Sequence, residues 1–206
     1  MPISWGPSEP YDTGDSNAVA LDDQGDVVEV HVGSGRLFSR VGTADFISDL
    51  GSITWGPSVE YDTGGPNAVA LWKDPGGAGY VAEVHVGSGR LFYRLGAADF
   101  TKQMITWGYS VEYDTGDSNA VAMDSYGNLV EVHVGSDRLF DRFGSPPFPG
   151  LDQRIPLSPS VEYDTGGPNA VARDNQGHVV EVHVGSGRLF YRVGHFTSQC
   201  SGAAFS

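Results

Sequence analysis

The chain has 206 residues, 29 of them glycine, and a formal net charge of −14. This glycine content, with 39% hydrophobic residues, indicates a folded, turn-rich protein instead of a disordered chain. A surface this acidic repels phosphate backbones and anionic lipids, so we expect no nucleic-acid partner.

Membrane insertion is not expected either, because no apolar run approaches the roughly 20 residues that cross a bilayer. The N-terminus lacks the basic segment and apolar run of a secretory signal. Cys200 is the single cysteine, so no intrachain disulfide forms, which is consistent with a reducing compartment. The location stays open between the cytoplasm and release by a non-classical route.

A unit of about 50 residues occurs four times along the chain. The units open on Ile3-Ser4-Trp5, Ile53-Thr54-Trp55, Ile105-Thr106-Trp107 and the weaker Pro156-Leu157. A period of this length with several short strands per unit is typical of propeller blades. We expect one domain with units at 3–52, 53–104, 105–155 and 156–194, followed by a tail at 195–206.

Each unit predicts four strands. In the second unit the first strand runs over 53–62, and the second is the alternating segment 67–71. An Asp-rich turn ending in glycine follows in the other units, and the second unit replaces it with a longer excursion at 72–79. The third and fourth strands form a hairpin, which in the first unit spans 28–40.

The register of this hairpin follows from side-chain pairing. A loop of two or four residues pairs Glu29 with Arg40 and His31 with Phe38, which leaves valines on the other face. An odd loop would set Glu131 against Asp141 in the third unit, a like-charge pair that costs stability. We therefore predict the even register. The third turn residue is Gly35, Gly89, Asp137 and Gly187 in the four units, and Gly or Asp there predicts a positive φ.

The predicted fold is an all-β, four-bladed β-propeller of four-stranded repeats, closed by the N-terminal strand. If each Trp strand is the outermost strand of the preceding blade, the first copy completes the last blade and removes an exposed edge. Two alternatives remain: an open array of four repeats, or a homo-oligomer in which two chains form a larger ring.

The repeated Glu-x-His pair is the first candidate for chemistry, because a carboxylate and an imidazole on one strand face can bind metal or exchange protons. The alternative is a polar network between blades, with the Glu paired to an Arg and the His stacked beside a Phe. Four near-equal copies argue against an enzyme, so we expect no catalytic residue, metal or cofactor. The residues are Glu29, His31, Arg40, Glu83, His85, Arg94, Glu131, His133, Arg142, Glu181, His183 and Arg192.

The recurring Tyr-Asp and Asn positions are a second candidate. Asp and Asn can hydrogen-bond vicinal hydroxyls of a sugar, while Tyr offers an apolar face. The alternative is turn chemistry, since Asp and Asn commonly bond their own backbone. The residues are Tyr11, Asp12, Asn17, Tyr61, Asp62, Asn67, Tyr113, Asp114, Asn119, Tyr163, Asp164 and Asn169.

Trp5, Trp55 and Trp107 are the third candidate, because an indole on an outer strand matches the apolar face of a pyranose. Packing between blades is the alternative. The fourth unit has Leu157 in this position, and packing tolerates leucine whereas stacking on a sugar does not.

The pattern Tyr-Asp-x-Gly, Val-Ala-Leu, Val-Val-Glu-Val-His and Leu-Phe-Tyr-Arg-Val-Gly over residues 3–194 resembles bacterial tandem-repeat β-propeller modules. It is similar in plan to propeller lectins, and its four-bladed size resembles the hemopexin-like fold. The lectin resemblance implies multivalent binding of glycans or glycoconjugates without catalysis, in which repeated weak sites gain by avidity. A structural or protein-interaction propeller is the alternative, and a glycan-directed hydrolase is a third.

Overall fold

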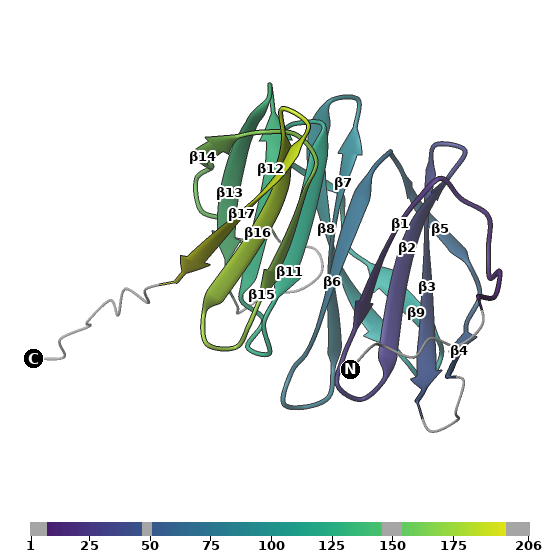
Figure 1. Cartoon of the computed structure of the whole chain (residues 1–206). Coiled ribbons are helices and arrows are strands. Elements are labelled where there is room, and N and C mark those ends of the chain that lie inside the picture. The colour runs from purple at the N-terminus through teal and green to yellow at the C-terminus, as the bar shows by residue number, and fades with distance from the viewer. Residues whose placement is uncertain (1–7, 47–50, 146–153, 197–206) are drawn as a thin grey trace, which may run out of the picture.

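The computed structural model describes residues 8–46, 51–145 and 154–196. These residues form four antiparallel sheets in a propeller arrangement and contain no helix, so none of them builds a membrane-spanning helix (Figure 1). The all-β propeller predicted from the repeats is confirmed.

The sheets follow the order of the units. Sheet one holds β1 (Ser16–Leu21), β2 (Asp26–Gly33), β3 (Arg36–Asp45), β4 (Ser52–Trp55) and β5 (Val59–Thr63). Sheet two holds β6 (Asn67–Lys73), β7 (Gly79–Gly87), β8 (Arg90–Asp99), β9 (Met104–Trp107) and β10 (Val111–Thr115). Sheet three holds β11 (Ser118–Met123), β12 (Leu129–Gly135), β13 (Arg138–Gly144) and β14 (Val161–Thr165), and sheet four holds β15 (Asn169–Arg173), β16 (His178–Gly185) and β17 (Arg188–His195).

The first strands of the second, third and fourth units join the preceding sheets, which is the arrangement that closure by the N-terminal strand requires. Both β4 and β5 pair with β3, β9 and β10 pair with β8, and β14 pairs with β13. The single strand expected over 53–62 is divided in two, since residues 56–58 are not strand. Pro57 lies at this break and has no N–H to donate to a ladder.

The hairpin register is the predicted one. Glu29 is the partner of Arg40 and His31 is the partner of Phe38, and the equivalent residues pair in the same way in the other three units. The turn has two residues with positive φ, 55° at Ser34 and 74° at Gly35, and φ is 61° at Asp137. Two successive positive φ values define the type I′ turn that suits the twist of a tight hairpin.

Each sheet has two different faces. We call the side with the Glu-x-His residues the Glu-His face, and the side with Val28, Val30 and their equivalents the Val face. The Val face of sheet one packs on the Glu-His face of sheet two, where Val28, Val30 and Val41 meet Val69 and Val81. The same stacking joins sheet two to three and three to four.

The stack leaves two faces without a neighbouring sheet. The inner strands β1, β6, β11 and β15 contact one another in series, and no comparable contact joins sheet four to sheet one within the described ranges. Figure 1 shows sheet one at one side and sheets three and four at the other, with β6–β8 between them. Sheet four has three described strands. Residues 3–7 of the expected closing strand lie outside the described residues, and residues 8–14 form no strand.

Candidate functional site: the polar networks between sheets

The repeated polar residues meet in one network per unit, and the third unit shows its geometry. Glu131 lies 3.0 Å from Nδ1 of His133, and it accepts a hydrogen bond of 2.7 Å from the hydroxyl of Tyr113. Asp114 lies 3.5 Å from Nε2 of the same histidine. Because Tyr113 and Asp114 belong to β10 of sheet two, the network joins two sheets.

The contacts of the histidine with the glutamate and the aspartate recur in the other three units, and the tyrosine hydroxyl also donates to the glutamate in the first unit. His31, His85 and His183 each lie 3.0 Å from the glutamate two residues earlier, and they stack on Phe38, Phe92 and Phe190 at 5.4 Å. The Asp12, Asp62 and Asp164 carboxylates lie 3.7, 3.9 and 4.0 Å from Nε2 of these histidines. In every unit, therefore, the Glu-x-His and Tyr-Asp motifs form a single cluster.

The arginines differ from the prediction in their partners. The hairpin register places Arg142 opposite Glu131, yet its guanidinium binds Asp114, with Nη2 at 2.6 Å from Oδ2. Arg192 binds Asp164 in the same way at 2.6 Å. The predicted ion pair between Glu and Arg is therefore wrong. A strand of the preceding sheet brings an aspartate carboxylate closer to the arginine, and the glutamate is already in contact with His and Tyr.

Burial and hydrogen bonding control protonation in this network. Burial raises the pKa of Glu131 above its ordinary value, although the hydrogen bond from His133 acts in the opposite direction. Burial, and then the charge of Glu131, raises the pKa of Tyr113 well above its ordinary value. Burial also acts to raise the pKa of Asp114, but hydrogen bonds from Arg142 and the Thr115 amide lower it overall.

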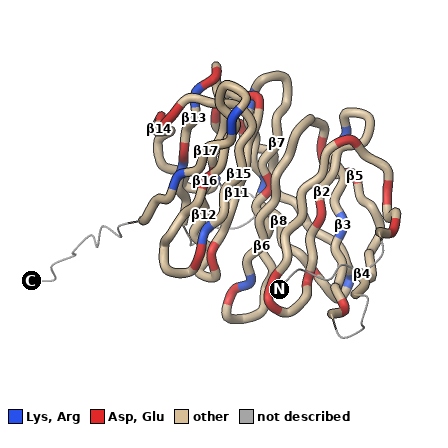
Figure 2. The backbone as a smooth tube through the Cα atoms, in the orientation of Figure 1, with Lys and Arg blue, Asp and Glu red and all other residues tan. Residues whose placement is uncertain are grey.

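The Glu-His pair of the third network is closed to solvent. Glu131 and His133 are each 1% exposed, so a substrate has no direct access to the pair. No group of three or more potential ligands that could hold a metal ion occurs among the described residues. The lysines and arginines lie scattered along the tube beside acidic segments and not in one basic patch (Figure 2).

The tryptophan side chains pack against other side chains of the protein more than the predicted sugar-binding role requires. Trp107 stacks on Tyr61 with ring centres 4.7 Å apart, and its indole N–H donates to the Ser39 hydroxyl of sheet one at 3.2 Å. Trp55 stacks on Tyr11 at 5.4 Å. Both indoles are half-buried, and Trp5 lies outside the described residues.

The asparagines divide into exposed and buried members. Asn67 and Asn119 are 9% and 8% exposed, and neither amide group has a hydrogen-bond partner within the described residues. Asn169 is half-buried and equally unpartnered there. Asn17 is exposed, and with Tyr11, Asp12 and His31 it lines a hollow of about 210 Å³ on sheet one.

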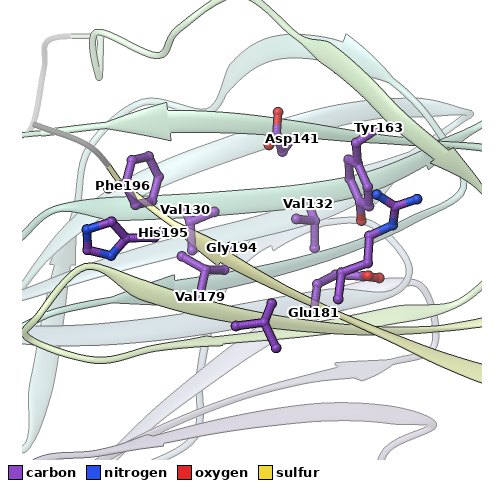
Figure 3. A pocket seen from close by; sticks show the side chains of 11 residues that line it. Val130, Val132, Asp141, Tyr163, Val179, Glu181, Gly194, His195 and Phe196 are labelled. Carbon is purple, nitrogen blue, oxygen red and sulfur yellow. The ribbon is translucent and has the colours of Figure 1, made fainter. Parts of the chain in front are cut away.

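A larger cavity, of about 360 Å³, lies between the Val face of sheet three and the Glu-His face of sheet four (Figure 3). Val130, Val132 and Asp141 line it from sheet three, and Val179, Glu181 and Gly194 line it from sheet four. Tyr163 and Arg192 of the fourth polar network also lie on its wall. Sequence reasoning did not find this cavity, because the same residue types fill the other junctions.

Comparisons with known proteins add no relative: no family model matches the chain, and no curated protein matches it.

Proposed function

We propose that the chain is a non-catalytic propeller module that acts through protein contacts, with its repeated residues serving to join the sheets. One observation supports this proposal. The glutamate and histidine side chains, which are the groups best suited to catalysis or metal binding, are buried between sheets and contact one another. Glu83 and His85 are 0% and 2% exposed, and Glu131 and His133 are each 1% exposed. Groups so placed stabilise the stack and are covered from ligands.

Three substitutions test this role. His133→Gln removes a buried partner of Glu131 and should lower the thermal midpoint. Wild-type protein should show no binding on a glycan array and no hydrolysis of a panel of glycosides. The proposal fails if the wild type binds a glycan and Asp62→Asn or Asp114→Asn abolishes that binding without changing the thermal midpoint.

Carbohydrate binding is a second candidate, favoured by the hollow in the first unit. Tyr11 offers a ring that is 38% exposed, while Asp12 and Asn17 offer polar groups for sugar hydroxyls in the same hollow. The equivalent Asn67 and Asn119 are buried, so this candidate concerns the first unit and not four equal sites.

The first and second units provide a matched test of that candidate. Asn17→Ala should weaken binding to any glycan found on an array, and Asn67→Ala, which changes a buried copy of the same residue, should not. Equal binding by wild type and Asn17→Ala would contradict carbohydrate recognition at this hollow.

A further inference from the structure

In the first three units, one glycine of the sheet lies directly against two bulky side chains of the following unit. A Cβ placed on Gly42 would lie 2.9 Å from Ile53 and 2.8 Å from Trp55. A Cβ on Gly96 would lie 2.5 Å from Ile105 and 2.8 Å from Trp107. In the third unit, Gly144 is covered in the same manner by Ile155 and Leu157.

The fourth glycine is uncovered. Among the described residues, a Cβ on Gly194 would meet no atom closer than Val179, at 4.0 Å. Gly194 and Tyr163 both line the cavity of about 360 Å³ (Figure 3). Tyr61, the equivalent tyrosine in the second unit, stacks on Trp107. The cavity therefore lies at the position that the Ile-x-Trp segment fills in the second unit.

The Val face of sheet four is exposed where its equivalents are buried. Leu189 is 84% exposed, whereas the equivalent leucines of the first three units, at positions 37, 91 and 139, are 0% exposed. Tyr191 is 75% exposed, whereas Tyr93 in the same position of sheet two is 4% exposed. In sheets one to three this face contacts the next sheet, so sheet four presents a surface built to receive a Glu-His face.

The Glu-His face of sheet one is the complementary surface. Its exposed part is Val19 and Leu21, which are 63% and 54% exposed, while Val27, Glu29 and His31 of the same face are buried. Val69 and Val121, in the positions equivalent to Val19, are each 7% exposed. Tyr11 already lies on this face, where its hydroxyl donates to Glu29 at 3.2 Å. In the second unit the equivalent segment, β5, pairs with the edge strand of the preceding sheet. Residues 8–14 have no such strand partner among the described residues.

From these equivalences we infer that the chain self-associates head to tail. Sheet four of one copy stacks its Val face on the Glu-His face of sheet one in a second copy, and Ile3 and Trp5 of that second copy fill the cavity beside Gly194. Trp5 then lies against Tyr163, as Trp107 lies against Tyr61. The inference rests on the proposed function and names its partner, a second copy of this chain.

A second copy fits the arrangement better than closure of the chain on itself. Sheets two and three lie between the two exposed faces (Figure 1), so those faces can meet within one chain only if the stacking of the sheets changes. Stacking on a second copy needs no such change. Head-to-tail contacts of this type close into a ring or continue as a filament, depending on the rotation between copies.

The inferred contact between two copies lacks one ion pair that is present at the three junctions within the chain. Arg36, Arg90 and Arg138 bind Glu60, Glu112 and Glu162 of the following unit, each at 2.7 Å. Pro10 occupies the equivalent position in the first unit, so Arg188 finds no carboxylate there. With a net charge of −14 on each copy, association should strengthen as salt screens the repulsion.

Light scattering coupled to size exclusion tests the inference on the full chain over a wide range of concentration. Wild-type protein should elute with the mass of two or more copies. Val19→Asp and Leu189→Asp, each alone, should elute as monomers, because each lacks one of the two faces. An equimolar mixture should form a species of two chains, since one intact face of each type remains. Tyr126→Asp, at an exposed aromatic outside both faces, is the control and should behave as wild type.

Gly194→Val tests the cavity separately. The substitution lies in β17, where a new Cβ would meet no described atom closer than 4.0 Å, so circular dichroism and the thermal midpoint of the monomer should not change. It blocks the place of Ile3 and Trp5, so the mass should fall to that of a monomer, and Trp5→Ala should have the same effect.

Three results would overturn the inference: a wild type that stays monomeric at every concentration, a Leu189→Asp variant that associates like wild type, or a monomer whose thermal midpoint falls on Trp5→Ala, which would show closure within one chain. These results leave the proposed function standing, because that proposal fails on glycan binding and not on mass.

Discussion

Tyr113 and Glu131 come from neighbouring sheets and share a hydrogen bond of 2.7 Å, with the phenol as donor. The glutamate is 1% exposed and its second partner is His133. At this junction, a strand that belongs to one sheet delivers a donor to a buried acceptor in the next.

Removing this donor should destabilise the stack. We expect Tyr113→Phe to lower the free energy of unfolding by about 1–3 kcal/mol, because a buried carboxylate loses one of its two partners. Urea denaturation measures the change. Tyr11→Phe, at the exposed end of the stack, is the control and should cost less. Equal losses in the two variants would contradict a role for burial.

The change of stability with pH should reveal the raised pKa of the buried glutamates. Burial raises the pKa of Glu131 in the folded state, so its contribution is fully present below the pKa of the unfolded chain and is lost as the pH rises through the raised pKa. Glu131→Gln stays neutral and should flatten this part of the profile, measured as the urea midpoint against pH. Glu162→Gln, an exposed glutamate paired with Arg138, is the control. Parallel profiles for wild type and Glu131→Gln would refute the assignment.

Not every polar residue in the junctions should stabilise them. The Asn119 amide is buried without a partner, which typically costs about 1–3 kcal/mol. We therefore expect Asn119→Ala to leave the free energy of unfolding unchanged or to raise it by about 1 kcal/mol. Asn128→Ala should lower it, because the Asn128 side chain donates to Asp124 at 2.9 Å. A clear loss of stability in Asn119→Ala would show that the amide has a partner in solution.

The tryptophans should act as packing residues. Trp107→Leu removes the stack on Tyr61 and the hydrogen bond to Ser39, so we expect a loss of roughly 1–3 kcal/mol in thermal or urea unfolding. Tyr126→Leu changes an aromatic side chain that is 65% exposed and should have little effect. If Trp107→Leu kept its stability and lost binding to a glycan, the sugar-platform hypothesis would replace the packing interpretation.

The sequence by itself determined the local structure. Alternating valines and the turn pair Ser34-Gly35 are enough to predict the hairpin, its even register and its positive φ, because these depend on neighbours within a few residues. The period of about 50 residues also predicted repeated sheets, and it raised the arrangement in which a Trp strand belongs to the preceding sheet. These features need no knowledge of how the sheets stack.

Only the tertiary structure decided which partners the polar residues bind and which faces stay open. Arg142 binds Asp114 instead of the cross-strand Glu131, since the preceding sheet supplies a carboxylate that the pairing of strands within one sheet cannot reveal. Leu37 and Leu189 occupy the same place in nearly identical hairpins, yet one is 0% and the other 84% exposed. Burial of a repeat depends on whether another sheet lies against it, and that depends on its position in the stack and not on its sequence.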